Sequence, residues 1–162
     1  MNRIQRAYAW FLRAANACQS PLLLAIRLYW GWQFWQTGMG KLSHIPKVTD
    51  YFTSLRVPAP DFTAYFNALL EVGGGILLAL GLGSRVIALL LAGDMIGAYV
   101  FGDPEALKSV ISDPGKFYNA DPFTFMFASL LVLIFGPGWI SLDTAIARYR
   151  KRRQTANAVA GS

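Results

Sequence analysis

Four long apolar stretches dominate this 162-residue chain, and three of them contain a charged residue. The stretches are Pro21–Met39, Phe62–Leu82, Val86–Phe101 and Pro122–Ile140, and the charges are Arg27, Glu71 and Asp94. A helix needs ~20 mostly apolar residues to cross the hydrocarbon layer of a bilayer. An ionisable group at its centre costs ~2.5–3.5 kcal/mol on insertion scales and usually faces the bundle interior. The pattern predicts an all-α, polytopic membrane four-helix bundle with a polar interior.

The composition favours a membrane protein. Hydrophobic residues make up 54% of the chain and charged residues 15%, whereas a soluble domain carries ~25% charged residues. The net charge of +6 comes from basic residues outside the apolar stretches, so we interpret it as an orientation signal and expect membrane lipid, not nucleic acid, as a partner. We expect an interfacial segment over 1–20, a four-span membrane domain over 21–143 and a basic cytoplasmic tail over 144–162.

The segment before the first apolar stretch alternates arginines with aromatic and aliphatic residues, which is typical of a short amphipathic helix in the headgroup plane. Ser20 followed by Pro21 predicts the start of a new helix. At the other end, Gly136-Pro137-Gly138 should break the fourth helix, and Ser141 or Asp143 can cap a short basic C-terminal helix.

The distribution of Lys and Arg predicts the orientation. An even number of spans places both termini on one side, and that side collects nine basic residues against five on the other. Basic residues are enriched in cytoplasmic loops. We therefore expect a multi-pass protein of the cell (inner) membrane with both termini cytoplasmic.

Cys18 and His44 are single residues of their kind, which excludes several types of chemistry. One thiol forms neither an internal disulfide nor a Cys-x-x-Cys pair. One histidine cannot supply both axial ligands of a bis-histidine haem or a histidine-rich metal centre. We expect no metal site, and no electron transfer by this chain unaided.

The charges in the spans are expected to form one buried polar layer. At 1.5 Å per residue, Arg27, Glu71 and Asp94 lie about 9, 16 and 12 Å from the cytoplasmic ends of their spans, so they can meet, with Arg27 and Glu71 as the central pair. The surplus carboxylate then needs a proton or another donor, and Asp94 is the candidate. Gln33, Asn67 and Lys41 lie further toward the outer side.

Helical phase supports a shared interior, because one stripe of the first span carries both charged and small residues. The members of this stripe are Arg27, Gly31, Phe34, Gly38 and Lys41. Glycines allow close helix packing in membranes, and the candidates are Gly31, Gly38, Gly74, Gly93 and Gly97. Two interpretations of the charges remain open: they bind a ligand or a proton, or they only hold helices together.

Several motifs in order resemble the DoxX family. They are Arg27-x-x-x-Gly31-x-x-Phe34-x-x-x-Gly38-x-x-Lys41, Pro58-Ala59-Pro60, Glu71-x-x-Gly74-Gly75, Gly81-Leu82-Gly83-Ser84-Arg85 and the run Gly136–Asp143. The resemblance covers about Leu22 to Asp143. It implies a small four-helix membrane protein, and some relatives are membrane subunits of thiosulfate:quinone oxidoreductases or associate with thiol-redox proteins.

Two functions from different classes follow. The first is a membrane subunit of a redox system linked to the quinone pool, with a partner oxidoreductase supplying the chemistry and quinone as the candidate cofactor. The aromatic-rich first span and the polar layer fit such a site. The alternative is a non-catalytic membrane scaffold or a small-solute or proton pathway. The sequence leaves open whether the chain is itself an enzyme. A homo-oligomer is compatible with either function.

Overall fold

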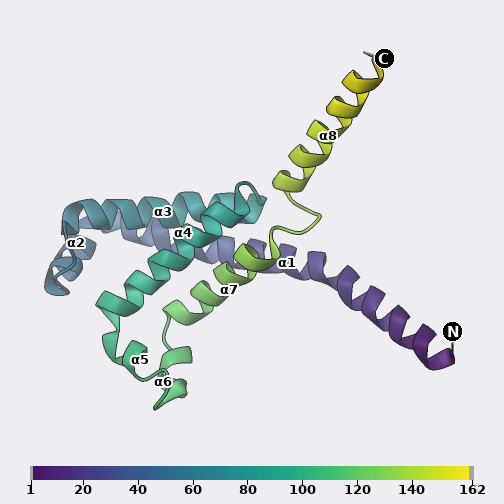
Figure 1. Ribbon diagram of the computed structural model, residues 1–162. Coiled ribbons are helices and arrows are strands. Elements are labelled where there is room, and N and C mark those ends of the chain that lie inside the picture. The colour runs from purple at the N-terminus through teal and green to yellow at the C-terminus, as the bar shows by residue number, and fades with distance from the viewer. Residues whose placement is uncertain (1, 161–162) are drawn as a thin grey trace.

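The computed structural model describes residues 2–160, and these are helical with no strand among them (Figure 1). The elements are α1 (Arg3–Ser43), α2 (Ile45–Ser54), α3 (Pro60–Leu80), α4 (Ser84–Gly97), the π-helical turn η1 (Ala98–Gly102), α5 (Pro104–Lys108), α6 (Pro114–Tyr118), α7 (Pro122–Phe135) and α8 (Leu142–Ala160).

The four longer helices of the body pack as two pairs, with α1 along α3 and α4 along α7, and α3 also touching α4. Phe34, Leu78, Leu91 and Val132 bring side chains from all four helices into one buried cluster. Both ends of the chain lie at one end of this body, and α2, α5 and α6 lie at the opposite end (Figure 1). The protein is therefore all-helical around a shared apolar core.

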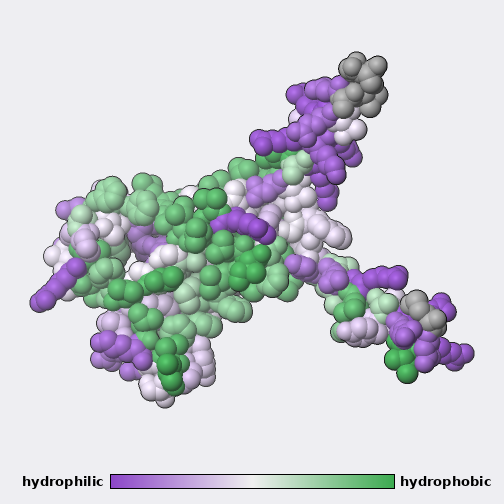
Figure 2. All heavy atoms as spheres, in the orientation of Figure 1, coloured by the Kyte–Doolittle hydropathy of each residue, from purple (hydrophilic) through white to green (hydrophobic). Residues whose placement is uncertain are grey.

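Two of the described helical stretches are long and apolar enough to cross a membrane by length and composition, namely α3 and Ser84–Gly102. The apolar helix α7 has 14 residues, about 21 Å. It ends where predicted, because Gly136 and Gly138 take φ values of 78° and 77° that interrupt the helix. Hydrophobic residues also cover much of the visible face of the body (Figure 2).

The predicted helix boundary at Ser20-Pro21 is wrong, because α1 continues through Pro21. The Ser20 hydroxyl does not cap a new helix. It accepts a hydrogen bond from the Trp139 backbone N–H at 2.8 Å. Pro21 removes one N–H donor from the helix, yet residues 3–43 remain one helix.

The contact between α1 and α3 is a close approach of two backbones. A Cβ atom on Gly31 would lie 2.6 Å from the carbonyl oxygen of Gly75, and one on Gly38 would lie 2.7 Å from the backbone nitrogen of Val72. A Cβ on Gly75 would in turn lie 2.5 Å from the Gly31 carbonyl oxygen. Only glycine fits at these three positions without moving the helices apart, as expected for a small-residue helix interface.

The other predicted packing glycines divide into two groups. Gly74 faces α4, where a Cβ would lie 3.0 Å from the Leu91 side chain. Gly93 and Gly97 face open space, since no described atom beyond their own stretch of helix lies within 4 Å of a Cβ built on either residue. The prediction of a helix contact at Gly93 and Gly97 is therefore wrong, because α4 presents its buried residues Leu91, Ala92 and Met95 to its neighbours.

The start of α8 is tied to the start of α4. The Ser141 hydroxyl accepts the Thr144 N–H at 3.1 Å and caps α8 as predicted. The Asp143 carboxylate instead accepts the N–H groups of Gly83 and Ser84 at 2.8 and 2.9 Å. Burial alone would raise the pKa of Asp143, but these hydrogen bonds outweigh burial and hold the pKa below its ordinary value. Asp143 thus caps α4 from a distant part of the sequence.

The glycine contact predicts opposite effects for two glycines of the same helix. Gly38→Ala should lower stability by about 1–3 kcal/mol, because the added methyl group overpacks the α1–α3 contact. Gly40→Ala is the control: nothing lies within 4 Å of its Cβ, and replacing an interior helical glycine gains about 0.5–1 kcal/mol. Thermal unfolding in detergent measures both variants, and a Gly38→Ala protein as stable as Gly40→Ala would contradict the close approach.

Candidate functional site

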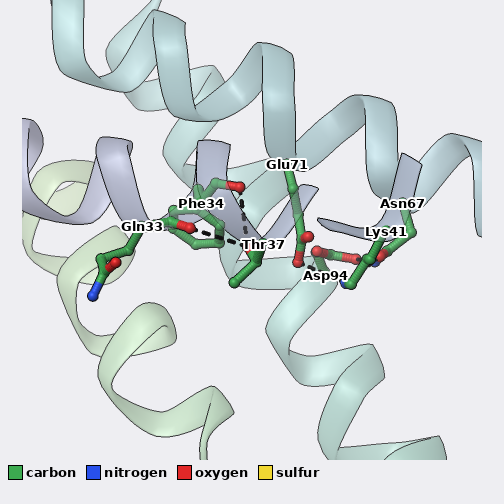
Figure 3. A network of polar contacts seen from close by, with 7 residues as sticks. All are labelled: Gln33, Phe34, Thr37, Lys41, Asn67, Glu71 and Asp94. Atoms are coloured by element: carbon green, nitrogen blue, oxygen red, sulfur yellow. Dashed lines mark hydrogen bonds and ion pairs between the residues drawn. The ribbon is translucent and has the colours of Figure 1, made fainter. Parts of the chain in front are cut away.

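Four polar side chains from three helices meet inside the body of the protein (Figure 3). Lys41 comes from α1, Asn67 and Glu71 from α3, and Asp94 from α4. Asn67 and Glu71 are four residues apart and therefore lie on one face of α3. The Lys41 ammonium donates to Glu71 Oε1 at 2.8 Å and to Asn67 Oδ1 at 2.5 Å. The Asn67 amide donates to Asp94 Oδ1, which links all four residues. We call them the polar cluster.

The helix contact explains why Lys41 reaches Glu71. Gly38 lies one turn before Lys41 and packs against the backbone of Val72, the neighbour of Glu71. Glu71 is 2% exposed, so its carboxylate has left water almost completely. The Lys41 side chain is 29% exposed. The cluster is therefore buried on its carboxylate side and reachable from its lysine side.

The charges of the polar cluster do not balance. Two carboxylates face one ammonium group, which leaves one negative charge in surplus. Glu71 Oε2 and Asp94 Oδ2 are both buried and have no hydrogen-bond partner among the residues that the structure describes. Buried polar atoms are normally paired, and adjacent carboxylates disfavour each other's ionised form. The arrangement can therefore hold a proton on one carboxyl group or accept a hydrogen-bonding ligand.

The predicted layer is split in the structure, because Arg27 lies away from the polar cluster. Arg27 is fully buried, lies against Gly81, and donates through Nη2 to the carbonyl oxygen of Ile140. Its Nε and Nη1 atoms have no partner among the described residues. The predicted Arg27–Glu71 pair is wrong.

The register of the helices explains this correction. The glycine contacts set α1 and α3 antiparallel, so that Gly38 faces Val72 and Gly31 faces Gly75. Continuing this register brings Arg27 level with Gly81, which is ten residues and about 15 Å beyond Glu71 along a helix. The sequence-based prediction measured the depth of each residue from the end of its own span. It therefore held no information on how the two helices align with each other.

Gln33 also lies outside the polar cluster. Its side chain points away from Glu71 and Asp94 (Figure 3), and its amide lies 3.3 Å from the Tyr29 hydroxyl. In the part of the chain that the structure describes, no three His, Cys, Asp or Glu residues could hold a metal ion together. The sequence patterns did not identify the role of Gly75, which packs against Gly31, or the contact from Asp143 to α4.

The Lys41–Glu71 pair should appear as a coupling energy in a double-mutant cycle. Lys41→Met and Glu71→Gln should each destabilise the protein, and the double variant should lose less than their sum, with a coupling of about 1–3 kcal/mol. The partial exposure of Lys41 keeps this below the ~3–5 kcal/mol lost when a fully buried pair is broken.

The cycle between Arg27→Met and Glu71→Gln is the matched control. These two residues share no contact, so their effects on the thermal unfolding free energy should add to within about 0.5 kcal/mol. Coupling between Arg27 and Glu71 without coupling between Lys41 and Glu71 would contradict the observed pairing.

Comparison with known proteins places the chain in a family. The DoxX family profile matches residues 22–103. An uncharacterized membrane protein of Mycobacterium tuberculosis is 32% identical over 148 residues, which are 84% of this chain and 88% of that protein. A Bacillus subtilis protein named "Putative oxidoreductase CatD" is 26% identical over 128 residues, 79% of this chain and 89% of that one. No solved structure matches significantly. This chain is a membrane protein that belongs to the DoxX family.

Proposed function

We propose that this DoxX-family protein is a four-span protein of the cell membrane and a membrane subunit of a quinone-linked redox system. In this proposal α3 and Ser84–Gly102 are two spans, and Pro21–Met39 of α1 and the short α7 are the others. A helix shorter than the hydrocarbon layer is accommodated by local thinning of the bilayer. In the same proposal, residues 1–20 are the interfacial segment and residues 144–162 are the cytoplasmic tail.

The observation that carries the functional proposal is the polar cluster. It places two unpartnered carboxylate oxygens, Glu71 Oε2 and Asp94 Oδ2, inside helices that are proposed to span the membrane. Ionisable residues inside membrane spans usually serve proton relays or ligand binding. An ion pair that only holds helices together would need Lys41 and Glu71 alone. Such a purely structural role therefore does not account for Asp94.

The donors in the polar cluster suit a quinone. A quinone presents carbonyl oxygens, which accept hydrogen bonds, and it carries electrons and protons together when bound. The Lys41 ammonium, the Asn67 amide and a protonated Asp94 carboxyl group are the available donors, and the exposed part of Lys41 leaves an approach from one side. Asp94 would then hold or release the proton at Oδ2.

In this proposal the redox centres belong to a partner. The sequence contains one Cys and one His, too few for a dithiol centre or a bis-histidine haem. The name of the Bacillus subtilis relative refers to an oxidoreductase, which is consistent with a redox role and says nothing of the partner. The alternative function is a non-catalytic membrane scaffold or a small-solute or proton pathway, and a proton pathway would use the same carboxylates.

Asp94→Asn tests the role of the surplus carboxyl group. The amide keeps the size and hydrogen bonding of Asp94 but cannot titrate. We expect Asp94→Asn to insert and fold normally and to fail to complement a deletion strain under oxidative or sulfur-redox stress. Asp61→Asn, at an exposed position in the first turn of α3, is the control and should complement fully. Full complementation by Asp94→Asn at unchanged stability would support the scaffold function instead.

Mild detergent extraction followed by mass spectrometry tests the quinone and the partner directly. Wild-type protein should retain quinone and an oxidoreductase, and Asp94→Asn should retain less quinone at the same protein yield. Extraction of wild-type protein with neither molecule, under conditions that preserve its fold, would contradict the redox proposal.

The proposed topology is tested by reporter fusions at Ser109, next to α5, and at Ser162. The basic residues predict that Ser162 is cytoplasmic and Ser109 lies on the outer side, so a reporter active only in the periplasm should work at Ser109 alone. Equal activity at both positions would rule out four spans.

A further inference from the structure

We propose that the groove between α8 and the α3–α4 turn binds an anionic phospholipid, with its acyl chains on α3 and α4 and its headgroup on α8. The groove has a volume of about 950 Å³. Its apolar wall includes Leu77, Val86 and Ile87, and its α8 side includes Ile146, Arg150 and Lys151. This inference does not depend on the redox proposal.

The apolar wall lies on the outside of the helical body and continues along its surface. Val86 is 65% exposed at the first turn of α4. Ile146 on α8 is 41% exposed and faces the same groove. In water such a surface would be unfavourable, whereas an acyl chain lying along α3 and α4 would cover it.

The basic side of the groove lacks acidic partners. Among the residues that the structure describes, the ion pairs are Lys41–Glu71 and Lys116–Glu105, and neither involves α8. Asp143 also lines the groove, but both of its carboxylate oxygens already accept hydrogen bonds from Gly83 and Ser84. Arg150 and Lys151 are therefore free to bind an anion, and Figure 2 shows the hydrophilic α8 projecting from the hydrophobic body.

The combination of these two surfaces selects the ligand. Basic clusters next to a membrane span attract anionic headgroups, but charge alone would suit any soluble anion. An apolar wall that runs from the basic residues along two helices suits a molecule that is anionic at one end and apolar along the rest. A single phospholipid has this chemistry.

The test titrates the purified full-length protein in detergent with phosphatidylglycerol, and with phosphatidylcholine as the neutral probe. Lipid retention is measured by native mass spectrometry and stability by thermal unfolding. Phosphatidylglycerol should be retained and should raise the unfolding midpoint, while phosphatidylcholine should do neither. Arg150→Gln/Lys151→Gln should reduce phosphatidylglycerol retention on the order of tenfold, because two headgroup contacts are lost.

Two further variants make the result specific to the groove. Arg148→Gln/Arg152→Gln removes the same charge from α8 outside this groove and should retain phosphatidylglycerol nearly as well as wild type. Ala147→Trp fills the groove without changing charge and should also reduce retention. Equal loss in both charge variants would mean diffuse attraction and would overturn the site. Full retention of phosphatidylglycerol in Ala147→Trp would overturn the groove as the binding site. Equal stabilisation by inorganic phosphate would overturn a lipid as the ligand.

Discussion

The close antiparallel contact of α1 and α3 is the constraint on which the rest of the site depends. Gly31, Gly38 and Gly75 let the two backbones approach to distances that no side chain permits. This contact fixes the register of the two helices, and the register places Lys41 beside Glu71 and Arg27 beside Gly81. The buried charges are thus positioned by small residues at a distance of one helical turn or more.

The structure separates its buried charges into two sets with different surroundings. Arg27 donates to the carbonyl oxygen of Ile140, close to the point where Asp143 caps α4. Arg27 therefore belongs to the region that connects α8 to the rest of the protein. The polar cluster lies further along α1 and α3 and retains two unpartnered carboxylate oxygens. Arg27 also has two unpartnered nitrogens, Nε and Nη1, among the described residues, but only the polar cluster brings two carboxylates together with one ammonium group. This difference is the reason for assigning function to Asp94 and not to Arg27.

The helical class, the family, the end of α7 and the members of the polar cluster were predictable from the sequence. Each of these features is encoded in composition or in local patterns. Lys41, Asn67, Glu71 and Asp94 were all among the candidates. The pairing was not predictable by counting depth from each helix end, since register depends on contacts between helices. Ser20-Pro21 is not a helix boundary, because α1 continues through Pro21. The Ser20 hydroxyl instead accepts from Trp139, a residue far away in sequence.

A zero-length crosslink tests the central pairing most directly. The lipid-soluble dicyclohexylcarbodiimide adds to a buried carboxyl group. An amine in direct contact then displaces the reagent as dicyclohexylurea and forms an amide, so the protein loses the mass of one water. Because Lys41 Nζ lies 2.8 Å from Glu71 Oε1, treatment of the protein in membranes should join Lys41 to Glu71. Mass spectrometry of the digested protein should show this linked pair, and Lys41→Met should abolish it. The account would be contradicted if the reagent modified Glu71 but the peptide containing Glu71 was not joined to the peptide containing Lys41.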